Sequence, residues 1–128
     1  MISTTISRTS AVFLGLPGLA LLFGSDVLLP AVVPDFPSSG TWIGQLLAAS
    51  WLGIARFNWG ARDSVLGGIY GRPIVQLNVL IYVVGALGLL TSGHLSAPLR
   101  FVAGPTIAFG VVYTALMFRG PFDARPPK

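Results

Sequence analysis

The chain has 128 residues, of which 53% are hydrophobic and only 9% are charged, and its mean hydropathy is +0.78. Soluble domains carry about 25% charged residues, so this chain has too few charges to cover a surface that faces water. The absence of cysteine excludes disulfides, thiolate catalysis and sulfur-ligated metals. The composition therefore predicts an integral membrane protein.

Four apolar segments follow one another along the chain, separated by short breaks rich in proline, glycine or polar residues. Each is about 18 to 21 residues long, and about 20 helical residues cross a 30 Å hydrocarbon layer. Their apolar runs are continuous and lack the alternation of a membrane β-barrel. The sequence predicts an all-α fold, a single domain over 1–128 forming a transmembrane four-helix bundle, with spans at about 11–29, 41–58, 73–93 and 98–118.

The first span, AVFLGLPGLALLFGSDVLL, is expected to be ended by Pro30, Pro34 and Pro37, because each proline lacks an amide donor and clashes with the preceding turn. Arg8 followed by an apolar run is also typical of a secretory signal peptide. The run is long, contains Asp26 and offers no clear small-x-small cleavage site. We therefore expect a retained helix.

The second span leads into an arginine- and glycine-rich loop at 59–72, within the stretch NWGARDSVLGGIYGRP. One interpretation is that Arg56, Arg62 and Arg72 anchor a cytoplasmic turn against lipid phosphates. The alternative is that glycines let the loop approach a phosphate or carboxylate, using guanidinium and backbone donors. The glycine spacing matches neither the Walker nor the Rossmann pattern, and no strand precedes it.

The third span begins at Pro73 and places an amide and a phenol, Asn78 and Tyr82, on a face with small residues. The fourth span carries another small-residue stripe, and Pro105 predicts a local kink there. These faces favour close helix packing first and a ligand cleft second. The candidate ligand-binding residues are Arg56, Asn58, Arg62, Arg72, Gln76, Asn78 and Tyr82.

Asp26 is the one acid within a predicted span, and a carboxylate in a membrane needs a partner. Gly15, Gly18 and Leu22, followed by Ser25 or Asp26, form a stripe at three- and four-residue spacing, from which we expect Asp26 to face the bundle. Its candidate partners at the same end are His94 and Arg100. We expect a structural polar clasp among these three residues, with a proton or cation site as the alternative.

The positive charges predict the orientation. With both termini in the cytoplasm, only Arg100 among the arginines and lysines lies outside, which agrees with the positive-inside rule. The isoelectric point of about 10.4 then reflects topology, and no basic and aromatic surface suited to nucleic acid is visible. We expect a bacterial inner (plasma) membrane.

Catalytic groupings are sparse. His94 is the sole histidine and the chain has no glutamate, so neither a two-histidine metal site nor a two-carboxylate mechanism is expected from one chain. We assign no catalytic residue, metal or cofactor, and favour a non-enzymatic role.

The layout, the glycine-bearing first helix GLPGLALLFG and a second helix ending in LGIARFNWGAR before a glycine-rich turn resemble the small DoxX-like and related four-helix membrane proteins of bacteria. That resemblance implies a role in a redox complex or as an accessory subunit and assigns no functional residue. Small multidrug transporters share the layout but rely on a glutamate in the first helix, where this chain offers only Asp26.

Two functions follow. The first is a non-catalytic subunit or scaffold that packs with lipid and with other membrane proteins or further copies of itself. The second is a carrier or binding protein for a lipid or small molecule, with an interhelical site that opens on the arginine-rich side.

Overall fold

The computed structural model describes residues 1–93 and 95–123, and this part of the chain is entirely helical apart from its turns. No strand occurs among the described residues, which confirms the all-α prediction. The helices are α1 Ile2–Val32, a short 3₁₀ turn η1 Ser38–Gly40, α2 Thr41–Gly60, α3 Arg72–Thr91 and α4 Ala97–Arg119.

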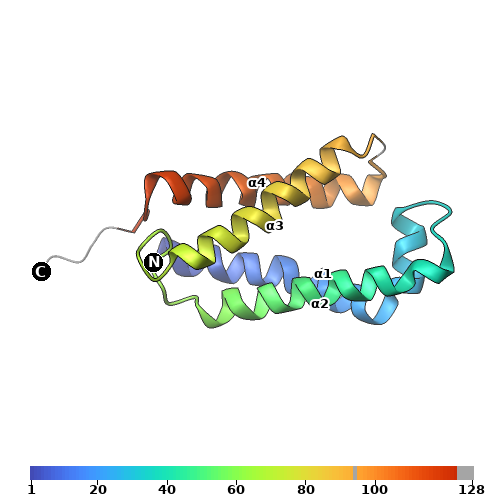
Figure 1. The fold of residues 1–128 in the computed structure, drawn as a ribbon, viewed down its shortest axis with the longest axis horizontal. Coiled ribbons are helices and arrows are strands. Elements are labelled where there is room, and N and C mark those ends of the chain that lie inside the picture. The colour runs from blue at the N-terminus through green and yellow to red at the C-terminus, as the bar shows by residue number, and fades with distance from the viewer. Residues whose placement is uncertain (94, 124–128) are drawn as a thin grey trace, which may run out of the picture.

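The helices form two hairpins, α1 with α2 and α3 with α4, each packed along its length. Contact between the hairpins is much sparser (Figure 1). The hairpins lie close at the end that holds the N-terminus and the α2–α3 loop, and they diverge toward the other end. We call these ends the arginine end, which carries Arg8, Arg56, Arg62, Arg72 and Arg119, and the far end.

The first helix differs most from its predicted bounds. It starts at Ile2, well before residue 11, and ends at Val32, before Pro34 and Pro37. Of the three prolines predicted to end it, Pro30 does not, because the helix passes through it. A proline inside a helix removes one hydrogen bond but fixes a φ angle that the helix tolerates, so the last turn persists. The bend lies instead at Gly24, where the backbone leaves helical geometry (φ −130°, ψ 27°).

The other three helices begin and end within two residues of the predicted segments. Pro73 and Pro98 occupy the first turns of α3 and α4, where a missing amide donor costs nothing. By length and composition α1, α3 and α4 are apolar enough to cross a membrane. The second helix is not in that group, because Gln45, Arg56 and Asn58 make it more polar.

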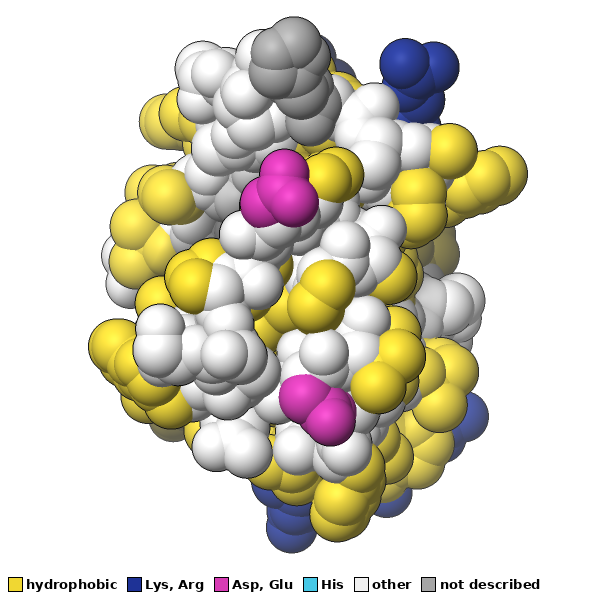
Figure 2. Space-filling model, turned by 90° about the vertical axis from the view of Figure 1, so that its right-hand side faces the viewer, with side chains coloured by type: hydrophobic (Ala, Val, Ile, Leu, Met, Phe, Trp, Pro, Cys, Tyr) yellow, Lys and Arg dark blue, Asp and Glu magenta, His cyan; other side chains and the backbone are white. Residues whose placement is uncertain are grey.

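The surface of the bundle exposes many large apolar side chains, which is unfavourable in water. Phe23, Phe101 and Phe118 are each at least 80% exposed. Figure 2, which views the far end, shows apolar side chains around the rim and acidic side chains on the end face. A contiguous apolar surface of this kind suits lipid or a protein partner.

Candidate functional site: a buried polar network beside an apolar cleft

Two asparagines, one from each hairpin, bond to each other inside the bundle. The Asn58 amide of α2 donates to Asn78 Oδ1 at 2.8 Å, and the Asn78 amide of α3 donates back to Asn58 Oδ1 at 2.7 Å. Asn78 also donates to the backbone oxygen of Ile74 at 2.8 Å. Both side chains are fully buried, and each supplies the hydrogen-bond partner that the other needs in the absence of water.

A serine from α1 and a tyrosine from α3 complete this network. Ser10 Oγ accepts from the Asn58 amide at 3.0 Å and donates to Asn78 Oδ1 at 3.3 Å. The Ser10 and Tyr82 hydroxyls are hydrogen-bonded at 2.7 Å. We call Ser10, Asn58, Asn78 and Tyr82 the polar network. It joins three helices and ties the hairpins together.

An aromatic stack lies next to the polar network. The Tyr82 ring stacks on Phe109 at 4.9 Å and on Tyr113 at 5.8 Å between ring centroids. Phe13 of α1 contacts both Tyr82 and Phe109, at 6.2 and 5.5 Å. The Tyr113 hydroxyl is fully buried and has no hydrogen-bond partner among the described residues, and the same holds for Ser7 Oγ.

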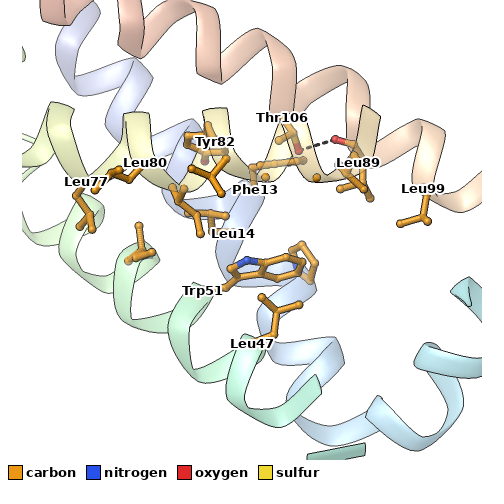
Figure 3. Close-up of a pocket in the computed structure, with 17 residues that line it drawn as sticks. Phe13, Leu14, Leu47, Trp51, Leu77, Leu80, Tyr82, Leu89, Leu99 and Thr106 are labelled. Atoms are coloured by element: carbon orange, nitrogen blue, oxygen red, sulfur yellow. Dashed lines mark hydrogen bonds between the residues drawn. The ribbon is translucent and has the colours of Figure 1, made fainter. Parts of the chain in front are cut away.

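Beyond the aromatic stack, toward the far end, the diverging hairpins enclose a cleft of about 660 Å³. Its walls come from all four helices and are almost entirely apolar. Figure 3 shows Trp51 and Leu47 of α2 facing the cleft from one hairpin, with Leu77 and Leu80 of α3 along the other. Its volume is that of an ordinary small-molecule site, but it offers very few polar groups to orient a ligand.

The few polar side chains of the cleft are already engaged. Thr106 Oγ1 donates to the backbone oxygen of Val102 at 2.7 Å, and the Tyr82 hydroxyl bonds to Ser10. The cleft can therefore exclude water and hold an apolar group, but it presents no nucleophile, general base or metal ligand. The described residues hold no cluster of three or more histidine, cysteine, aspartate or glutamate side chains.

The seven residues predicted to bind a ligand divide into two groups. Asn58, Asn78 and Tyr82 meet in the polar network, whereas the other four lie apart on the surface. Gln76 and Arg72 are exposed on α3, and Arg56 is exposed on α2. Of the seven, only Tyr82 lines this cleft, so the cleft does not include the arginines of the predicted opening.

The predicted clasp at the far end is not formed by its described members. Asp26 is exposed, and no ion pair joins it to Arg100 in the described part of the chain. The Arg100 Nε instead donates to the backbone oxygen of Leu95 at 3.2 Å. His94 lies outside the described residues. The stripe continues instead into Ser25, which is buried against Gly44 of α2, so its neighbour Asp26 lies on another side of the helix.

The arginine end is closed by a set of contacts around Ser3. The Asp123 carboxylate accepts hydrogen bonds from the amides of Ile2 and Ser3, at 2.8 and 3.0 Å, and from the Ser3 hydroxyl. Ser3 Oγ in turn accepts from the amide of Leu66 at 3.1 Å, and Leu66 is fully buried. These contacts, here called the Ser3 closure, join the first helix, the α2–α3 loop and the segment after α4.

The hydrogen bonds of the Ser3 closure act on the Asp123 charge. The Ser3 hydroxyl, and then the amides of Ser3 and Ile2, hold the pKa of the Asp123 carboxyl below its usual value. A carboxylate at a helix N-terminus also faces the positive end of the helix dipole. The closure is therefore strongest when Asp123 is ionised.

Two loop glycines serve close packing. Gly67 has a positive φ of 85°, and a Cβ there would lie 2.8 Å from the backbone of Gly120 and Pro121. A Cβ on Gly71 would collide with the backbone of Val65 and Leu66. The structure thus explains these glycines by the packing of the loop against its own chain.

Sequence reasoning did not assign Ser3, Ser10 or Asp123. Ser3, Ser7 and Ser10 recur at four- and three-residue spacing, so they lie on one helix face, and all three are buried. That spacing could have predicted a buried polar face on the first helix. The role of Asp123 was not readable, because its partners lie about 120 residues away in the chain.

Comparisons of the chain with protein-family models, with curated proteins and with solved structures gave no match. The DoxX-like resemblance stays a prediction, and the function has to be argued from the polar network, the cleft and the surface.

Proposed function

We propose that the protein is a non-catalytic membrane subunit, a scaffold that packs against lipid and other membrane proteins. The observation that carries this proposal is that the polar network satisfies its own hydrogen bonds, which leaves only the hydroxyls of Ser7 and Tyr113 buried without a partner among the described residues. Asn58 and Asn78 satisfy each other and Tyr82 bonds to Ser10, so the interior keeps few groups for chemistry. The exposed apolar faces are what remains for contact with other molecules.

The absence of a reactive group in the cleft supports the same proposal. A catalytic site needs a nucleophile, base or metal within reach of its substrate, whereas this cleft has apolar walls. An apolar cleft between helices can receive a side chain or a helix from a partner, because membrane helices associate through packing.

Purification in native lipid, followed by mass spectrometry of intact complexes, tests the scaffold. The expected result is a stoichiometric partner protein or a defined oligomer, lost when Val84 or Leu80 on the exposed edge of α3 is changed to a bulkier residue such as Trp. A monomer that retains no protein under these conditions contradicts the proposal.

A second function is favoured by the cleft itself: binding of an apolar small molecule or a lipid chain between the hairpins. The volume of about 660 Å³ lies within the usual range for ligand pockets, roughly 300–1,000 Å³. Trp51 and Phe13 supply aromatic surface, which makes up much of the lining of such pockets.

Substitutions at two glycines with similar surroundings distinguish this second function from the first. Gly88 lines the cleft and Gly104 does not, yet a Cβ on either one has no neighbour within 4 Å. Gly88→Leu should fill the cleft and abolish retention of a bound apolar molecule in native mass spectrometry, while Gly104→Leu should leave it unchanged. Equal retention in both variants would sink the binding function.

A further inference from the structure

A second hollow, of about 440 Å³, lies on the outer face of α2 near the arginine end. Arg56 is its one charged residue, and the rest of its wall is formed by Gly53, Phe57, Gly60 and Ala61. The hollow exists because glycines stand one turn before and one turn after the arginine. Nothing lies within 4 Å of the position that a Cβ on Gly53 would occupy.

The charge of Arg56 has no counterpart in the part of the chain that the structure describes. No carboxylate lies within ion-pair distance of it, and its Nη1 reaches over Gly60, where a Cβ would lie at 2.9 Å. Arg62, one and a half turns further along, contrasts with it. Arg62 donates to the backbone oxygen of Trp59 at 2.9 Å, lies 5.6 Å from the Trp59 ring centroid and pairs with Asp63 at 3.9 Å.

The position of Arg56 decides what can neutralise it. Trp59 is 45% exposed and, as an aromatic residue near the helix end, is the kind of residue that lies at the level of lipid head groups. Arg56 lies about one turn closer to the middle of α2 than Trp59. A guanidinium at that depth is costly without an anion, and its planar set of donors fits phosphate oxygens in a bidentate way.

We infer that the hollow around Arg56 binds the phosphate of an anionic phospholipid, with Phe57 against the start of the acyl chains. Gly60 leaves room for the guanidinium itself, and Gly53 leaves open space for the lipid one turn before Arg56. This inference rests on the proposed function only in requiring that the protein lies in a membrane.

The test is native mass spectrometry of lipids retained after extraction from vesicles that contain phosphatidylcholine and phosphatidylglycerol in equal amounts. Arg56→Gln should reduce the preference for phosphatidylglycerol about fivefold, the scale of one basic residue acting near a charged membrane surface. Arg62→Gln removes the same charge next to the site but should change the preference less, since Arg62 already has partners.

Gly53→Leu distinguishes a built site from general attraction between positive charge and anionic lipid. It keeps every charge and fills the hollow, so it should reduce the preference as much as Arg56→Gln. Gly104→Leu on α4 is the matched control and should retain the wild-type preference. Thermal melting of each variant establishes that it is folded.

Five outcomes overturn the inference. A wild-type preference in Gly53→Leu, or an equal loss in Arg62→Gln and Arg56→Gln, means general electrostatics only. Displacement of the bound lipid by millimolar inorganic phosphate in Arg56-containing protein means a site for a soluble anion. If the protein partitions into the membrane but shows no lipid preference, the lipid site is contradicted and the scaffold function is not. If the protein stays soluble without detergent, both proposals are contradicted.

Discussion

The two ends of the bundle hold their hairpins together in different ways. At the arginine end the polar network and the Ser3 closure connect α1, α2, α3 and the segment after α4 through buried hydrogen bonds. Toward the far end apolar side chains face one another across the cleft with few contacts. Lipid chains are as apolar as leucine, so apolar surface alone gives little attraction between helices in a membrane. Specific hydrogen bonds and close packing therefore determine where the hairpins stay joined.

The largest expected effect comes from the packed half. Leu116 is only 1% exposed, whereas Leu80 on the cleft edge is 62% exposed. Leu116→Ala should lower the free energy of unfolding by about 2–3 kcal/mol, because it leaves a cavity among close neighbours. Leu80→Ala should cost well under about 1 kcal/mol, as expected for surface positions. Equilibrium unfolding of both variants in mixed micelles measures the difference, and equal losses would remove the contrast between the halves.

The next effect concerns the asparagine pair. Asn78→Ala should cost about 1–2 kcal/mol, because it leaves the buried Asn58 amide without its partner. The double variant Asn58→Ala with Asn78→Ala should cost less than the sum of the single ones, since the second change removes the stranded group. Additive losses in the same unfolding experiment would mean that the two amides do not act as a pair. Gln76→Ala, at an exposed position two residues before Asn78 on the same helix, serves as the control.

A smaller effect is expected at the Ser3 closure. Asp123→Ala removes a carboxylate that caps α1 and should cost about 1 kcal/mol at neutral pH. The pKa of Asp123 is lower in the folded protein than its usual value, so its contribution is complete above about pH 4 and is lost as the pH falls through the folded pKa. Melting curves of wild type and variant should converge at acidic pH. A gap that stays constant from neutral to acidic pH would assign the loss to something other than the charge.

The smallest effect has the opposite sign. Tyr113→Phe removes a buried hydroxyl that has no partner among the described residues, so stability should stay the same or rise. Tyr82→Phe removes a bonded hydroxyl from the neighbouring ring and should lower it. Melting temperatures of the two variants, measured side by side, sharpen the account of the aromatic stack. A loss in Tyr113→Phe as large as in Tyr82→Phe would show that its hydroxyl is satisfied.

Local patterns in the sequence were sufficient to predict most of the helices. The hydrophobic segments and the prolines at Pro73 and Pro98 placed α2, α3 and α4 closely, since these signals act within one or two turns. The bounds of α1 failed because a helix can continue through proline near its end and through a serine-rich start. Four spans and the orientation remain predictions.

The candidate site was predictable only in part. Asn58, Asn78 and Tyr82 were recognisable because polar residues in apolar helices need partners, and the structure brings these three together. Which partners they choose depends on how the hairpins pack, and this is a long-range property that spacing along one helix does not encode. The same applies to Arg56. Its hollow depends on the nearby Gly53 and Gly60, but whether a carboxylate lies close to it depends on how all the other elements pack.

The course of α1 affects where the cleft is open. After the bend at Gly24 the last turns lead to Val32, whose carbonyl accepts a hydrogen bond from Ser96 Oγ at 3.1 Å, so the two hairpins also touch at the far end. Leu47 of α2 and Leu80 and Val84 of α3 line the cleft and are exposed, so the cleft is open sideways between these two helices. If α2 and α3 lie in a bilayer, as we propose, a solute that binds in the cleft would first dissolve in the hydrocarbon phase. Its apparent affinity from water should then rise about fourfold for every methylene added, through partitioning alone.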